Sequence, residues 1–93
     1  MKDARRVHLR MEGEVQGLWF PAAARDEAVR LGLVGWAREI ADGRVECLAE
    51  GPEDGLEQLV GWCRQDTGWW RVREVDVRWF PATGDFRRFE VRS

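Results

Sequence analysis

Two glycines, Gly13 and Gly17, bracket a short segment between a strand-like run and a helix-like run. Glycine reaches positive φ values and allows a backbone to approach a ligand closely. Backbone N–H groups in such a segment converge at the start of the following helix, where the helix dipole also favours negative charge. The residue types and their spacing therefore predict a loop that binds phosphate or another small anion.

The sequence of this loop, Gly13-Glu14-Val15-Gln16-Gly17-Leu18-Trp19-Phe20, resembles the acylphosphatase signature Gly-x-Val-Gln-Gly-x-x-Phe-Arg. Acylphosphatases are small enzymes that hydrolyse carboxyl-phosphate anhydrides. Further blocks resemble the same family in order and spacing, at residues 31–36, 42–45, 50–52, 81–86 and 89–92. The resemblance implies a phosphate-binding loop formed by Glu14, Val15, Gln16, Gly17, Leu18, Trp19 and Phe20.

Two side chains that the resemblance assigns to catalysis are replaced in this chain. In the family, an arginine directly after the loop phenylalanine binds the phosphoryl oxygens, and an asparagine in the second strand orients the attacking water. Pro21 stands at the arginine position and Glu39 at the asparagine position. Phosphoryl transfer spreads negative charge over the equatorial oxygens, so it needs a cation and fixed donors. We therefore expect a catalytically impaired or inactive protein, a pseudoenzyme of this family.

Arg25 is the candidate substitute for the missing cation. It lies one helical turn beyond Pro21, and helical side chains lean toward the N-terminus of their helix. The competing interpretation is a surface arginine that pairs with Asp26 or Glu27, and we favour that interpretation.

Glu39 also allows two interpretations. The first is a general base for another reaction, or a site for an amine. The second, which we favour, is a surface glutamate at a drifted site. His8 alternates away from the apolar residues of its strand, so we expect it on the open side of the sheet, in a structural role.

Composition limits the remaining possibilities. The chain has 93 residues and a net charge of -2, with 44% hydrophobic residues, which predicts one soluble globular domain over residues 1–93. This small negative net charge does not favour binding to nucleic acid or to an anionic membrane surface. No apolar signal segment opens the sequence, so we expect a cytoplasmic protein. Cys47 and Cys63 are expected to be buried free thiols, and no metal or cofactor is predicted.

The elements that position these residues follow from periodicity. Apolar residues alternate in strands and recur at helical spacing in helices, and Gly32 is expected to end the first helix. The predicted order is a strand at 7–11, a helix from 21, strands at 33–40 and 44–50, a helix from 52, a strand at 75–79 and a short segment at 89–91.

This β-α-β-β-α-β order predicts an α+β, ferredoxin-like two-layer sandwich, with an antiparallel four-stranded sheet and both helices on one face. A second class of function stays open with this fold. A non-enzymatic module could bind protein or RNA on the open sheet face, as many ferredoxin-like domains do. The acidic composition weakens the RNA version, and no protein partner is indicated by the sequence.

Overall fold

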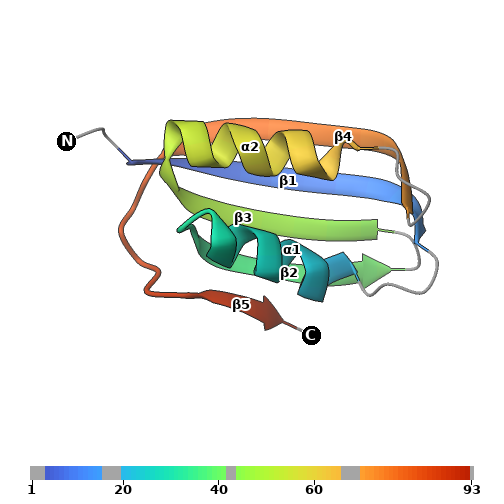
Figure 1. Ribbon diagram of the computed structural model, residues 1–93, viewed down its shortest axis with the longest axis horizontal. Coiled ribbons are helices and arrows are strands. Elements are labelled where there is room, and N and C mark those ends of the chain that lie inside the picture. The colour runs from blue at the N-terminus through green and yellow to red at the C-terminus, as the bar shows by residue number, and fades with distance from the viewer. Residues whose placement is uncertain (1–3, 16–19, 42–43, 66–69, 93) are drawn as a thin grey trace.

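Two helices cover one face of a five-stranded sheet in the computed structural model, which describes residues 4–15, 20–41, 44–65 and 70–92 (Figure 1). The sheet has the strand order β4-β1-β3-β2-β5. Along the chain the elements are β1 (Ala4–Val15), α1 (Phe20–Arg30), β2 (Val34–Ala41), β3 (Arg44–Pro52), α2 (Glu53–Cys63), β4 (Trp70–Pro81) and β5 (Phe89–Arg92). The predicted order of helices and of the first four strands is confirmed.

The prediction of a four-stranded antiparallel sheet is wrong, because the C-terminal segment forms a fifth strand. β5 pairs in parallel with β2, from Gly35 opposite Phe89 to Arg38 opposite Arg92, so the sheet is mixed. Phe89 is buried in the core, and the N–H of Gly35 donates to the carbonyl of Arg88 at 3.0 Å. β5 thereby covers an edge of β2 that would otherwise expose unpaired backbone groups.

The ends of the first helix follow local sequence signals. α1 begins at Phe20, one residue before the predicted start, so Pro21 lies in the first turn, where its missing N–H costs no intrahelical bond. Gly32 ends the helix with φ 74°, as predicted. The N–H of Leu33 donates to the carbonyl of Ala28 at 2.9 Å, which satisfies a carbonyl in the last turn.

The hydrophobic core lies between the helices and the sheet. Its fully buried members include Leu9, Leu56 and Leu59. The rings of Phe20 and Trp62 join the two helices, with their centroids 5.4 Å apart. Cys47 and Cys63 are buried free thiols, as predicted. Among the helices described, neither has the length and apolar character needed to cross a membrane.

Candidate anion-binding site at the start of α1

The start of α1 is fixed by burial of its first two residues. Phe20 and Pro21 are both buried, and Phe20 packs against Trp62 of α2. Pro21 is among the fully buried side chains of the protein. The position where the resemblance expects a guanidinium therefore holds a buried ring that has neither charge nor backbone N–H.

The predicted phosphate-binding loop is only partly within the described residues. Gln16, Gly17, Leu18 and Trp19 lie outside them. The first two predicted loop residues, Glu14 and Val15, belong to β1, which runs further than the sequence indicated. They pair with Arg71 and Trp70 of the long strand β4, beyond a register shift at Glu12 and Gly13. This shift is a β-bulge, which lets the pairing continue past the interruption.

Glu39 lies on the same side of the sheet as the helices. Ala37, two residues earlier in β2, is fully buried in the core, and side chains two residues apart in a strand share a face. Glu39 stands opposite Val45 of β3 and is exposed. Since α1 packs against β2, Pro21 of the helix and the side chain of Glu39 in the sheet lie on the same side of the sheet. This side of the sheet presents the carboxylate of Glu39, where an anionic substrate would need a neutral or positive group.

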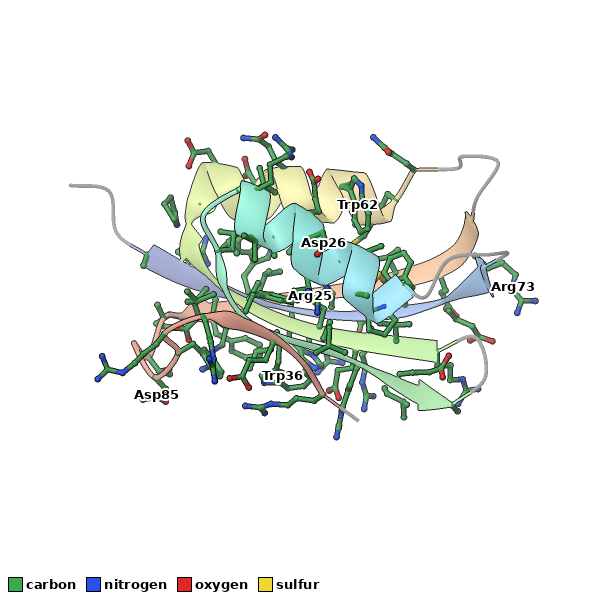
Figure 2. All side chains as sticks on the ribbon, turned by 60° about the horizontal axis from the view of Figure 1, so that its bottom comes forward. Arg25, Asp26, Trp36, Trp62, Arg73 and Asp85 are labelled. Carbon is green, nitrogen blue, oxygen red and sulfur yellow. The ribbon has the colours of Figure 1, made fainter. Side chains whose placement is uncertain are left out.

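Arg25 is paired with its neighbour on α1. Its guanidinium donates to Oδ1 of Asp26, with nitrogen–oxygen distances of 3.2 and 3.3 Å, and Figure 2 shows the two residues side by side on the helix. The side chains of Arg25 and Asp26 are 43% and 73% exposed, so solvent screens this pair strongly. The favoured expectation of a surface arginine next to Asp26 agrees with this arrangement.

Residues 7–91 match the family model of acylphosphatase. The chain belongs to the acylphosphatase family. It is 49% identical to an acylphosphatase of Anaeromyxobacter sp. (strain Fw109-5), over 99% of both chains. It is 45% identical to that of Methylococcus capsulatus, over 94% of this chain and 95% of the relative. The crystal structure of acylphosphatase from Bacillus subtilis superposes with a TM-score of 0.86 at 30% identity, covering 96% of this chain and 99% of that one.

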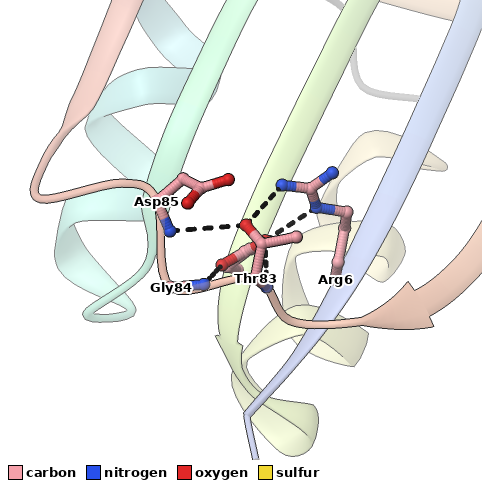
Figure 3. Close-up of polar contacts among 5 residues, drawn as sticks. Arg6, Thr83, Gly84 and Asp85 are labelled. Atoms are coloured by element: carbon pink, nitrogen blue, oxygen red, sulfur yellow. Dashed lines mark hydrogen bonds and ion pairs between the residues drawn. The ribbon is translucent and has the colours of Figure 1, made fainter.

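Within this acylphosphatase-family fold, sequence reasoning missed a buried carboxylate at Glu50. Glu50 is 3% exposed and accepts a bond from Nε of Arg6 at 2.7 Å. It also accepts from the N–H and hydroxyl of Thr83 and from the N–H of Gly84, each at 3.0 Å. Figure 3 shows Arg6, Thr83 and Gly84 converging from β1 and from the segment after β4. The cluster fastens the connection that leads to β5.

Protonation of Glu50 is opposed by this network. Burial by itself would raise the pKa of the carboxyl group, but the N–H groups of Thr83 and Gly84 and the guanidinium of Arg6 outweigh burial. The net pKa of Glu50 is lowered, so the carboxylate stays charged near neutral pH.

A second missed carboxylate, Glu46, lies four residues before Glu50 in β3. Its Oε2 is 2.6 Å from Nε2 of His8, and its Oε1 accepts from Nε of Arg38 at 2.9 Å. Burial would raise its pKa, but the bonds from His8 and Arg38 lower it overall. His8 lies on the open side of the sheet, as predicted, because Val7 and Leu9 on either side of it are buried in the core.

One sequence signal could have located both carboxylates. Arg6, His8 and Arg10 alternate with apolar residues in β1, while Glu46 and Glu50 alternate with the buried residues Cys47 and Ala49 in β3. In the observed antiparallel register Arg6 faces Glu50 and Arg10 faces Glu46. Opposite charges at facing positions stabilise a sheet, so these pairs favour the observed register of β1 and β3 over registers in which the strands are shifted.

Proposed function

We propose that this member of the acylphosphatase family hydrolyses acyl phosphates very slowly or not at all, and that it retains weak affinity for phosphate. The observation that carries the proposal is the buried ring of Pro21 in the first turn of α1, where the family resemblance places an arginine. The alternative, full activity, would need a cation from elsewhere in the chain.

The proline affects catalysis through charge. A charge-assisted hydrogen bond contributes about 1.5–3 kcal/mol, and an arginine acting on a phosphoryl-transfer transition state accelerates turnover by about a thousandfold or more. Proline offers neither a positive charge nor an N–H donor. The developing charge on the phosphoryl oxygens would therefore be left to the backbone amides of the loop.

Glu39 is expected to add to this loss. An exposed carboxylate at the position of the water-orienting asparagine repels a phosphate dianion and offers no amide donor. Arg25 compensates poorly, because its guanidinium already lies next to the carboxylate of Asp26 and is exposed to solvent. Both changes thus weaken the site in the same direction.

Turnover of a simple acyl phosphate tests the proposal. We expect the protein to hydrolyse benzoyl phosphate at least about a thousandfold more slowly than a family member that carries the arginine, assayed in parallel. An Arg25→Ala variant should leave any residual rate unchanged. Ordinary turnover in the unmodified protein would contradict the proposal, and its loss in the Arg25→Ala variant would assign the missing role to Arg25.

A further inference from the structure

The open face of the sheet, away from both helices, carries a hollow of about 390 Å³ between β1, β3 and β4. Its lining combines four basic side chains, one acid and two apolar groups: Arg6, His8, Arg10, Arg78, Asp76, Leu48 and Phe80. The volume falls within the range of small-molecule sites, about 300–1,000 Å³. Pro21 and the side chain of Glu39 lie on the helix-covered face of the sheet, so this hollow on the open face is separate from the candidate site at the start of α1.

Arg10 stands between two acidic residues of the neighbouring strands but forms an ion pair with neither. In the register of β1 and β3 it faces Glu46, but the two oxygens of Glu46 are bonded to His8 and Arg38. Within the described part of the chain Arg10 makes no ion pair, although it also faces Asp76 of β4. A guanidinium in that position is available to an incoming anion.

Arg78 supplies a second guanidinium beside the first. It stands opposite His8 in the register of β1 and β4, and its Nε is 3.3 Å from Oδ2 of Asp76. Both partners are more than half exposed, so solvent weakens this pair. Arg6, by contrast, is neutralised by the buried carboxylate of Glu50. The hollow thus keeps two weakly engaged guanidinium groups, Arg10 and Arg78, against one exposed carboxylate.

Apolar surface lies next to these cations. Phe80 is 43% exposed, which is unusual for a large aromatic side chain, and it faces Arg6 across the strands. Leu48 of β3 is half-buried and faces His8. A flat ring can pack against Phe80 and Leu48 with favourable geometry, while guanidinium groups pair with carboxylate oxygens through two parallel bonds.

We propose that this hollow binds a small aromatic carboxylate, with its ring against Phe80 and Leu48 and its carboxylate between Arg10 and Arg78. The charge arrangement selects an anion, and the apolar surface selects one that carries a ring. The proposal does not depend on the activity of the α1 site, since the two sites lie on opposite faces of the sheet.

Binding of benzoate to the whole protein tests the ligand class. Acetate, which has the carboxylate but no ring, and benzyl alcohol, which has the ring but no charge, serve as partial probes. Amide chemical shifts in a ¹H–¹⁵N spectrum report both location and affinity. We expect benzoate to shift the signals of His8, Arg10 and Phe80, with a Kd at least about fivefold lower than that of either partial probe. Equal affinity for acetate and benzoate, or shifts confined to residues at the start of α1, would overturn the proposal.

Variants test the assigned roles. Arg10→Gln and Phe80→Ser should each raise the Kd for benzoate at least about fivefold. Arg64→Gln, which removes the same charge at the end of α2, should leave it unchanged. Circular dichroism and the dispersion of the spectrum check that each variant is folded. Unchanged binding in folded Arg10→Gln, or an equal loss in Arg64→Gln, would contradict the site.

Discussion

Thr83 donates two hydrogen bonds to the same oxygen of Glu50, one from its backbone N–H and one from its hydroxyl, each at 3.0 Å. The hydroxyl also accepts a hydrogen bond from Nη2 of Arg6 at 2.9 Å. Glu50 of β3, Arg6 of β1 and Thr83 of the connection after β4 thus form one hydrogen-bonded cluster. This connection follows β4 directly and leads to β5. A single buried carboxylate therefore helps to place the strand that covers the edge of β2.

Replacing Glu50 with glutamine should destabilise the fold markedly. Glutamine removes the negative charge, leaves the partly buried Arg6 without its counterion and brings an amide donor toward the N–H groups of Thr83 and Gly84. We expect the free energy of unfolding in urea to fall by about 2–3 kcal/mol. Glu90→Gln is the matched control, because Glu90 pairs with the exposed Arg88 and should cost less than about 0.5 kcal/mol. Equal effects of the two changes would refute the role of Glu50.

Stability should decline on acidification. The pKa values of Glu46 and Glu50 are lowered in the folded protein, so protons bind the unfolded chain more readily than the folded one. Their contribution is present above the ordinary glutamate pKa of about 4.3 and is lost as pH falls through the folded values. Urea midpoints measured between pH 7 and pH 3 should decrease, with a shallower decrease in Glu50→Gln. Identical pH profiles would mean that Glu50 is not coupled to folding.

Restoring the two family side chains should restore hydrolysis. Pro21→Arg combined with Glu39→Asn gives the site the guanidinium and the neutral amide that the family resemblance assigns to catalysis. We expect measurable turnover of benzoyl phosphate and tighter binding of inorganic phosphate, with affinity falling at higher salt. Pro21→Arg alone should recover less, because Glu39 could pair with the new arginine and still repel the substrate.

The buried position of Pro21 calls for its own control. Pro21→Ala with Glu39→Asn removes the proline without adding a cation, so its comparison with the arginine variant isolates the guanidinium. The alanine variant should stay near the unmodified rate. A folded arginine variant with neither hydrolysis nor phosphate affinity would reject the anion-binding loop.

The two cysteines should be protected from thiol reagents in the native protein. Burial raises the pKa of Cys63 to about 12 and that of Cys47 well above its usual range, so little reactive thiolate forms at pH 8. We expect slow reaction with a disulfide reagent in buffer and rapid reaction of both thiols in denaturant. Rapid labelling of the folded protein would show that the core opens far more often than its packing indicates.

The sequence by itself determined the helices, the first four strands and the family. Phe20, Ala24 and Ala28 fall at helical spacing and Gly32 follows them, so α1 could be located from local pattern alone. The same holds for the alternation in β1, where apolar residues enter the core and His8 faces the other side. These signals are local, because a periodic face and a terminating glycine act within a few residues of the chain.

Only the tertiary structure decided the parallel pairing of β5 and the buried network around Glu50. A four-residue strand carries too little alternation to reveal which edge it joins. Arg6 and Glu50 are 44 positions apart, and Thr83 lies a further 33 beyond Glu50. Their contacts depend on the register between strands and on the path of the connection after β4. A register shift of one residue would turn Arg6 or Glu50 to the other face of the sheet, so long-range pairing rather than local pattern determines both groups of contacts.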